Sequence, residues 1–508
     1  MRNAVLLILP LLLLSGCSQN TTGVNNTVNS SQYSSGQFNV ILISVDSLRY
    51  DHLRMFGYER DTAPALEKFA QEGVSFDSYI TQAYLTPISE MALHTGQYPT
   101  SSGAVSFDTV LPEDKTTLAQ ILKIYGYRTA AIGTSPEFEN HPALRKSFEK
   151  GFDTYKISDA RIGSDIDTST STIKEWISEN GTKFFLWLPI GSIHWPYGNF
   201  KPTDKYGKFL DPDYQGFFYN KDPLNWNELG KIYQKQYYVF DGDKPTGEKK
   251  PLTDDDFAWM VDQYDGNILR FDDWLEEFLD ALDELGMRNN TIIVIASEHG
   301  EDFGEHGYIA HYDIFDTQIR TPLIIVAPGF PKNVTISDQV QSIDVLPTIL
   351  DMLAISKHHQ IQGSSVLPLV NGSVTSFNEH VFIERIPLWE HVISRGATTL
   401  YPYKEFYELD KESHFKDVAV RTKEWKLIYR QSRDIQQNYS WWGYLTETLP
   451  TIEEYELYDL RNDPMETTNV YDRYPKVAGA LKELLIEWLQ KEERNSAGMA
   501  LDYRQDYF

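Results

Sequence analysis

Cysteine is almost absent from this sequence, since Cys17 is the single cysteine among 508 residues. No disulfide can form within the chain, so its stability must come from the core and from any bound metal. Basic residues are also scarce, with 46 Lys and Arg against 73 Asp and Glu and a formal net charge of -27. This charge would repel a phosphate backbone, which argues against a nucleic-acid partner but not against a small anion in a cleft.

An apolar run long enough to span a bilayer is also missing. The N-terminal run, residues 4–14, is too short to cross a membrane and has the layout of a signal peptide. The following Leu-Ser-Gly-Cys resembles a bacterial lipobox, which implies cleavage before Cys17 and acylation of its thiol. We therefore expect a lipoprotein signal peptide over residues 1–16 and an acylated cysteine with a flexible, Ser- and Asn-rich tether over residues 17–37. The protein would be lipid-anchored in the bacterial cell envelope, and Ser18 favours the outer membrane over the inner one.

The remaining chain is typical of a large globular α/β protein, with 41% hydrophobic and 13% aromatic residues. Short apolar runs of the kind found in fully buried strands occur at 38–45, 129–132, 184–188, 291–296 and 322–326. Helical patterns lie between them, and the clearest begins after Thr253 and ends near Gly286. This alternation predicts a mainly parallel sheet flanked by helices on both faces.

The pattern changes near residue 375, where two antiparallel strands, at 418–422 and 425–430, and a terminal helix at 475–491 are expected. We therefore assign residues 38–375 to a catalytic domain and residues 376–508 to a smaller α+β subdomain.

Four separated segments contain the chemically informative residues. They are NVILISVDSLRYDH (39–52), TPISEMALHTGQYP (86–99), HWPY (194–197) and the region SEHGE…GEHG…H…RTPL (297–323). In order and spacing these segments resemble the sulfatase branch of the alkaline-phosphatase superfamily. The resemblance covers nearly everything from Phe38 onward. It implies an alkaline-phosphatase/sulfatase-like fold and the metal-dependent hydrolysis of sulfate or phosphate esters.

Asp46, Thr86, Glu298 and His299 are the candidate metal ligands. Asp46 and the Glu298-His299 pair follow two expected strands, at the sheet edge where ligands bind in parallel α/β folds. Hydrolysis of these esters requires stabilised negative charge and an activated nucleophile, and a divalent cation held by carboxylates supplies both. The imidazole favours manganese or zinc over calcium, although the sequence alone leaves all three open.

Thr86 occupies the position at which the sulfatase family has its nucleophile. In sulfatases this residue is a cysteine or serine that is oxidised to formylglycine, a conversion that Thr86 cannot undergo by that route. An unmodified threonine needs direct metal contact to attack, and it forms an ester that water must then hydrolyse. This favours phosphate or phosphonate esters over sulfate esters. A purely structural role, as a turn residue before Pro87, is the alternative.

Two histidines complete the predicted site. His194 matches the histidine of a family His-x-Pro-Tyr loop, a candidate general acid for the leaving group. His311 matches a lysine or histidine that contacts the substrate anion, and we expect both residues to bind substrate. Packing and capping roles are the alternatives for these two side chains. His306, by contrast, is expected to support the site from behind its ligands or to be structural.

Several residues depart from the family pattern. Ser47 replaces a second aspartate, Glu298 replaces the usual aspartate, Glu90 stands where Arg or His is expected, and Thr134 stands where a lysine is expected. Together they remove positive charge from the anion pocket, which counts against activity and favours a degenerate site.

The leading hypothesis, which rests on the ordered set of motifs, is a hydrolase that acts on a sulfate, phosphate or phosphonate ester of a sugar, lipid headgroup or small molecule. The alternative is a catalytically degenerate sulfatase-like lipoprotein that binds a glycan or a protein partner. A headgroup transferase is a third possibility, disfavoured because its membrane-embedded relatives have several spans.

Overall fold

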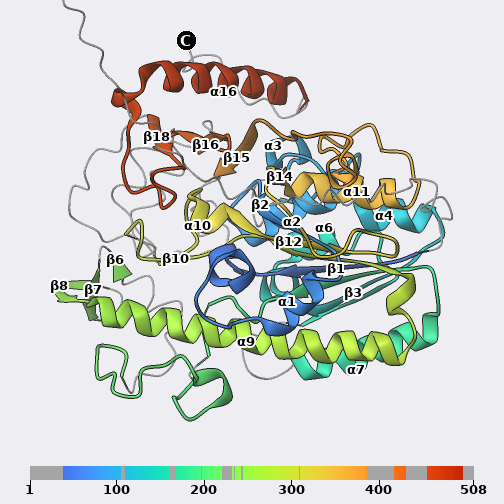
Figure 1. Cartoon of the computed structure of the whole chain (residues 1–508), viewed down its shortest axis with the longest axis horizontal. Helices are drawn as coiled ribbons and strands as arrows, with labels where there is room; N and C mark the ends of the chain where they lie inside the picture. Colours follow the sequence, from blue (N-terminus) through green and yellow to red (C-terminus); the bar gives the residue numbers. More distant parts are fainter. Residues whose placement is uncertain are drawn as a thin grey trace, which may run out of the picture.

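A mainly parallel sheet forms the centre of the protein (Figure 1). The structure is a computed structural model that describes residues 38–104, 109–158, 166–195, 197–198, 200–219, 232–233, 235–241, 244–307, 309–385, 417–430 and 455–495. The predicted signal peptide, Cys17 and the tether lie outside these ranges. Within them the central sheet has nine strands, in the order β13-β2-β12-β9-β1-β5-β3-β4 with β14 beside β2. Their bounds are β1 Asn39–Val45, β2 Val74–Ile80, β3 Arg128–Thr134, β4 Thr154–Ser158, β5 Phe184–Ile190, β9 Thr291–Ser297, β12 Arg320–Val326, β13 Val334–Ile336 and β14 Val340–Gln341.

The central strands are buried on both faces, which explains their continuous apolar sequences. Every residue of β1 is buried, and successive side chains enter different cores: Val40 and Leu42 one core, Ile41 and Ile43 the other. The pairs β1–β9, β1–β5, β3–β5 and β3–β4 are parallel, whereas β12 runs antiparallel to both β9 and β2. The predicted fold class is confirmed.

Helices cover both faces of this sheet (Figure 1). One face packs against α1 (Pro64–Ala70), α7 (Ile166–Asn180) and α9 (Asp254–Glu284). The other packs against α2 (Thr86–Thr95), α4 (Leu118–Ile124), α5 (Pro136–Asn140), α6 (Pro142–Phe148), α11 (Val345–Met352) and α12 (Leu367–Val370).

The long helix α9 begins and ends as its sequence predicts. The Thr253 side chain and that of Asp256 form a reciprocal capping box, and Gly286 follows the helix with a φ of 67°. A small sheet of β6 (Ile232–Tyr233), β7 (Gln236–Asp241) and β8 (Lys244–Pro251) precedes it.

The C-terminal region forms a second, antiparallel sheet with its own core. Its strands follow the order β15-β16-β17-β18, and α16 (Pro475–Asn495) packs over them. The strand bounds are β15 Val381–Arg385, β16 Asp417–Arg421, β17 Trp425–Tyr429 and β18 Tyr455–Asp459. These elements confirm the two antiparallel strands and the terminal helix; the boundary at residue 375 stays a prediction.

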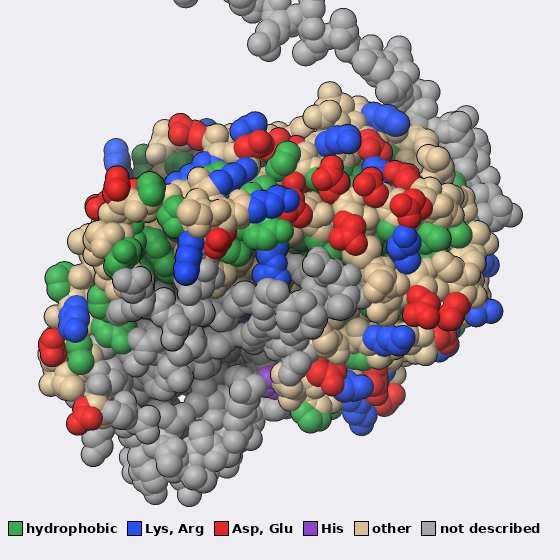
Figure 2. Space-filling model, turned by 90° about the horizontal axis from the view of Figure 1, so that it is seen from below, with side chains coloured by type: hydrophobic (Ala, Val, Ile, Leu, Met, Phe, Trp, Pro, Cys, Tyr) green, Lys and Arg blue, Asp and Glu red, His purple; other side chains and the backbone are tan. Residues whose placement is uncertain are grey.

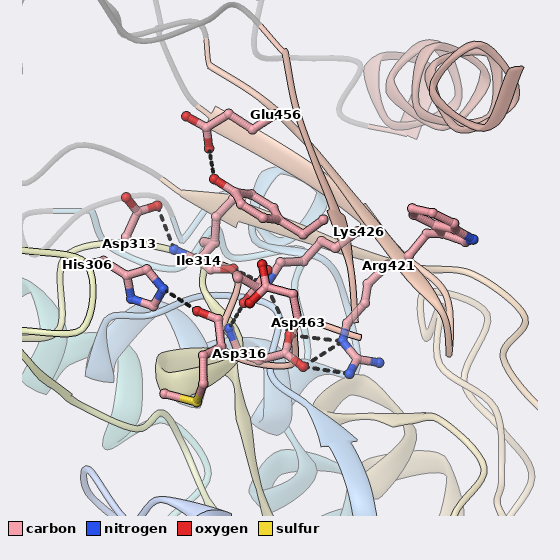
Figure 3. Close-up of polar contacts among 12 residues, drawn as sticks. His306, Asp313, Ile314, Asp316, Arg421, Lys426, Glu456 and Asp463 are labelled. Carbon is pink, nitrogen blue, oxygen red and sulfur yellow. Dashed lines mark hydrogen bonds and ion pairs between the residues drawn. The ribbon is translucent and has the colours of Figure 1, made fainter. Parts of the chain in front are cut away.

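Buried ion pairs join this sheet to the catalytic domain (Figure 3). Asp316, on the short helix α10 (Asp316–Ile319), lies 2.6 Å from Arg421 Nη2 and 3.0 Å from Lys426 Nζ. Burial opposes ionisation of Asp316, but Arg421 and Lys426 outweigh it and hold the pKa of this carboxyl well below its ordinary range. His306 bridges the same two parts, because one ring nitrogen contacts Asp302 and the other contacts the Met465 carbonyl. His306 therefore has the structural position that was expected.

The excess of acidic residues does not produce a surface of one sign on the face shown in Figure 2. Acidic and basic side chains are interspersed over the described part of that face. Among the described residues, no helix has both the length and the apolar character needed to cross a bilayer.

Candidate metal and catalytic site

The two carboxylates of the site follow neighbouring strands at the same sheet edge. Val45 of β1 pairs with Ser297 of β9 in parallel register, and this is the last pair of the two strands. Asp46 and Glu298 are the next residue of each chain segment, so they lie side by side. Backbone hydrogen bonds hold both positions, from Asp46 N to the Ile190 carbonyl (3.0 Å) and from Glu298 N to the Val45 carbonyl (3.3 Å). Both side chains are buried. The structure therefore brings together the two strand ends that the sequence placed there.

Asp46, Glu298 and His299 form a cluster with the composition of a metal site. One ligand atom from each lies within 4.8 Å of the others, and His299 Nε2 is 3.4 Å from Asp46 Oδ1. His299 Nδ1 donates to the Gly300 carbonyl (3.0 Å), and burial together with His311 lowers the pKa of His299. The ring is therefore neutral, with the lone pair of Nε2 directed at the cluster. Two carboxylates and this nitrogen suit a divalent cation.

The surroundings of Glu298 are those expected of a metal ligand. Burial, followed by the charges of Asp46, Glu90 and Glu137, raises the pKa of Glu298 well above its ordinary range. Its Oε2 atom is buried and accepts no hydrogen bond. Burying a carboxylate oxygen without a hydrogen bond or a bound ion costs free energy. The cluster therefore fits a cation both by its geometry and by the Glu298 Oε2 atom, which has no hydrogen-bond partner.

The turn after β1 is strained and firmly held. Ser47 has a φ of 62°, a left-handed conformation that is unfavourable for residues other than glycine. The Tyr264 hydroxyl donates to the Ser47 carbonyl (2.6 Å), and the Ser47 hydroxyl donates to Asp46 Oδ1 (3.0 Å). Ser47 thereby restricts the orientation of Asp46, a role that a second aspartate would not serve in the same way.

Thr86 begins α2 and contacts the metal cluster directly. Its Oγ1 atom lies 3.0 Å from His299 Nε2, and only 2% of the residue is exposed. The Ser89 hydroxyl donates to the Glu298 carbonyl (2.5 Å), which fixes the first turn of α2 against the end of β9. A hydroxyl at a helix N-terminus also lies where backbone N–H groups favour an anion. The predicted nucleophile is thus next to the predicted ligands.

The rings of His299, His311 and His194 lie in a row, each in contact with the next. The ring centroids of His299 and His311 are 4.1 Å apart, and those of His311 and His194 are 5.1 Å apart. His194 Nδ1 donates to the Trp195 carbonyl, which leaves Nε2 as the atom that can exchange a proton. All six predicted site residues of the catalytic domain therefore gather at one place, and Cys17 lies outside the described residues.

Glu301 is a site residue that the sequence analysis missed as such. It is fully buried, accepts from the Tyr197 hydroxyl and lies 3.4 Å from His311 Nδ1. Burial is the main cause that raises the pKa of Glu301 to about 8. Its position in the Ser-Glu-His-Gly-Glu segment was visible, but its contact with His311 depends on the antiparallel pairing of β10 (Asp302–Phe303) with β11 (Ile309–Ala310), in which Asp302 lies opposite Ala310.

A mainly parallel α/β sheet with two carboxylates and a histidine at its carboxyl edge is an arrangement suited to a metal-dependent enzyme. The model of the sulfatase family matches residues 38–355, and that of the N-sulphoglucosamine sulphohydrolase C-terminal region matches residues 304–493. The chain therefore belongs to the sulfatase family and is a sulfatase-like ester hydrolase.

Characterised relatives agree with this assignment. Arylsulfatase K from Bos taurus is 23% identical over 475 residues, which cover 88% of this chain and 81% of the relative. The N-acetylglucosamine-6-O-sulfatase of Bacteroides thetaiotaomicron is 22% identical over 525 residues, covering 90% and 87%. These enzymes do not favour the alternative of a non-catalytic binding protein.

Solved structures show the same fold. BT4656 in complex with its substrate D-glucosamine-2-N,6-O-disulfate has a TM-score of 0.67 at 19% identity, covering 92% of this chain and 100% of that one. The phosphonate monoester hydrolase of Agrobacterium radiobacter also has a TM-score of 0.67, at 20% identity, covering 90% and 96%.

Proposed function

We propose that this chain hydrolyses phosphate or phosphonate esters with Thr86 as nucleophile, and that sulfate esters are poorer substrates. The observation that carries the proposal is the 3.0 Å contact between Thr86 Oγ1 and His299 Nε2, beside Asp46 and Glu298. The site has a plain threonine rather than a residue that can become an aldehyde hydrate. Its covalent ester must therefore be opened by water, a route suited to phosphoryl transfer.

Each residue has a defined role in the proposed reaction. Thr86 Oγ1 releases its proton to solvent water and forms the bond to phosphorus, and the bond from phosphorus to the leaving oxygen breaks. His194 Nε2 donates the proton that the leaving oxygen takes up. His311, held through Nδ1 by Glu301, binds a non-bridging oxygen of the substrate. Water then attacks phosphorus and gives up a proton to His194, the bond from phosphorus to Thr86 Oγ1 breaks, and Oγ1 takes up a proton from solvent.

Asp46, Glu298 and His299 would hold the cation together with Thr86. A bound divalent metal would stabilise negative charge on the substrate and lower the pKa of the nucleophile. The neutral imidazole in this set favours manganese or zinc over calcium.

The substrate is proposed to be an ester of a sugar, lipid headgroup or small molecule. A sulfated glucosamine is the substrate of BT4656, and the Agrobacterium neighbour is a phosphonate monoester hydrolase. One structural neighbour thus binds a sulfate ester and the other is named for phosphonate esters. We propose that Thr86 determines which of these two classes this enzyme prefers.

We further propose that the enzyme is tethered to the bacterial envelope through an acylated Cys17, with the outer membrane as its site. The Leu-Ser-Gly-Cys sequence and Ser18 support this. Labelled palmitate should be incorporated into the wild-type chain and not into Cys17→Ser. Equal labelling of the two proteins would contradict the anchor.

The function is tested with aryl phosphate, phosphodiester, phosphonate and aryl sulfate substrates, each against manganese, zinc and calcium. We expect turnover of phosphate or phosphonate esters to exceed that of the matched sulfate ester with at least one metal. Absence of turnover with every pair would support a binding protein instead. Faster sulfate than phosphate hydrolysis would contradict the argument from Thr86.

A further inference from the structure

An exposed apolar pair lies where helix α4 ends. Ile124, the last residue of α4, is 80% exposed, and Tyr125 beside it is 48% exposed. Among the described residues, these are the two most exposed large apolar side chains. Such side chains gain free energy when they leave water, so this corner of the surface is suited to contact with an apolar phase.

The first described residue of the chain contacts the same corner. The Tyr127 hydroxyl donates to the Phe38 carbonyl (3.1 Å), and Gly126, with a φ of 82°, turns the chain from α4 into β3. Residues 18–37 connect Phe38 to the proposed anchor at Cys17. These residues span at most about 70 Å at full extension, so the anchor alone allows many orientations on a bilayer. A contact made by the folded part has to select one of them.

Two basic side chains lie beside the apolar pair. Arg128 begins β3 and Lys183 directly precedes β5, and the Arg128 amide donates to the Lys183 carbonyl (3.2 Å). Within the described ranges neither side chain forms an ion pair; that of Arg128 donates to Asn180 (2.8 Å). Lys123, by contrast, pairs with Asp153 (2.6 Å). The corner thus has local positive charge in an acidic chain, and anionic lipid headgroups attract such charge.

The proposed active site lies at the opposite edge of the sheet. Strand β1 begins at Asn39, beside the apolar pair, and ends directly before Asp46. The extended chain from Phe38 to Asp46 covers about 26 Å. Figure 1 shows α4 toward one end of the molecule and β10 and α10 toward the other. A surface that touches this corner is therefore remote from the site.

We propose that residues 123–128 and Lys183, which we call the edge patch, dock on the bilayer that holds the lipid anchor. Ile124 and Tyr125 enter the headgroup level, and the two unpaired basic side chains contact anionic headgroups, as in other interfacial contacts of this composition. The inference rests on the proposed anchor and deepens the proposed function. A site that faces away from the bilayer receives dissolved esters of a sugar or small molecule, and not the headgroups of the leaflet beneath it.

Site-specific fluorescence of the acylated protein in vesicles of phosphatidylethanolamine and phosphatidylglycerol tests the docking. Cys17 is the single cysteine, so after its acylation an introduced cysteine is the one thiol that a dye can label. Tyr125→Cys is compared with Tyr219→Cys. Tyr219 is the matched control because it is 46% exposed and follows Phe217, whose amide donates to Asp256 at the start of α9, toward the other end of the molecule (Figure 1).

Spin-labelled lipid should quench the dye at position 125 at least about threefold more strongly than the dye at position 219. Adding Ile124→Asp to Tyr125→Cys should remove most of this difference. Both side chains are exposed, so we expect the melting temperature to stay unchanged. Equal quenching at the two positions would overturn the docking. Labelled palmitate reports the anchor separately, and a protein without palmitate would lose the anchor and the docking together.

A second measurement addresses the substrate. Two phosphate esters with the same headgroup are compared, one short-chained and dissolved, the other long-chained and held in the same vesicles as the enzyme. We expect turnover of the dissolved ester alone, and comparable turnover of the membrane-held ester would overturn the orientation. Turnover of neither ester would contradict the proposed function, and the quenching would then decide the docking by itself.

Discussion

The hydroxyl of Thr86 and the ring of His299 are 3.0 Å apart although 213 residues separate them in the chain. The start of α2 and the end of β9 thus create a single reactive position. Replacing Thr86 by alanine removes the proposed nucleophile without changing the fold around it. We expect turnover to fall by at least about 10³-fold in a steady-state assay with an aryl phosphate.

The matched control for Thr86 is Thr95→Ala at the other end of α2. Its hydroxyl donates to the Met91 carbonyl and has no contact with the cluster. Turnover by this variant should stay within a few-fold of the wild type. Unchanged turnover by Thr86→Ala would remove Thr86 from the mechanism.

His194→Asn should separate proton donation from binding. A good leaving group such as nitrophenolate needs little protonation, whereas an alkoxide needs a full proton. The variant should therefore lose about 10²- to 10⁴-fold on alkyl esters and much less on nitrophenyl esters. Equal losses on the two substrates, measured as kcat/KM, would show that His194 does not act as the acid. His358→Gln is the control, because His358 lies between α11 and α12 and is not one of the three histidines of the site.

Metal removal should destabilise the protein as well as inactivate it. An ion present at 100 times its dissociation constant adds about 2.7 kcal/mol to the free energy of unfolding. Chelation by EDTA should therefore lower the melting temperature of the wild type by several degrees, and manganese or zinc should restore it. Asp46→Asn should show a much smaller response in the same calorimetric scan. An equal response in both proteins would place the stabilising ion elsewhere.

His306 should make stability depend on pH. Burial disfavours its charged form, but the hydrogen bond and charge of Asp302 prevail and raise the pKa of His306 to about 9. Because the folded pKa exceeds the ordinary value of 6.5, the stabilisation is complete below pH 6.5 and is lost as the pH rises through 9. The gain is at most about 3 kcal/mol. In urea titrations His306→Gln should be less stable than the wild type at pH 6, and the difference should shrink by pH 9.5. A constant difference would contradict this origin.

The pair of Arg421 and Asp316 should be essential to the contact between the catalytic domain and the C-terminal sheet. Arg421→Met leaves the buried Asp316 short of a partner, so we expect a loss of about 3–5 kcal/mol in the free energy of unfolding. The exposed pair of Arg461 and Glu424 provides the control, and Arg461→Gln should cost less than about 1 kcal/mol. Similar losses in the two variants would indicate that burial of the pair is unimportant.

Much of the fold could be predicted because local signals agree with the tertiary structure. Thr253 and Gly286 mark the ends of α9, and the uniform burial of β1 matches its apolar sequence. Strand direction was less accessible. The strand β12 is as apolar as β1 and β9, which are parallel to each other, yet β12 runs antiparallel to β9, because hydrophobicity does not encode direction. The strands β7 and β8 were also missed, since their sequence lacks a clear alternation.

The site residues could be predicted where a family motif coincides with the end of a strand, as at Asp46 and Glu298. Contacts that depend on how segments outside the central sheet fold could not be predicted. Glu301 reaches His311 because the short strands β10 and β11 pair beside the sheet edge, with Asp302 opposite Ala310. No spacing in the sequence specifies this contact.

Every residue of α2 is buried, so this helix has no side that faces water. A change of charge on it cannot be absorbed by solvent and must be matched by a neighbour or an ion. A change of charge on α2 that alters ester preference should therefore need a second, compensating substitution in the segments around it. A single replacement there that adds or removes a charge would destabilise the folded protein.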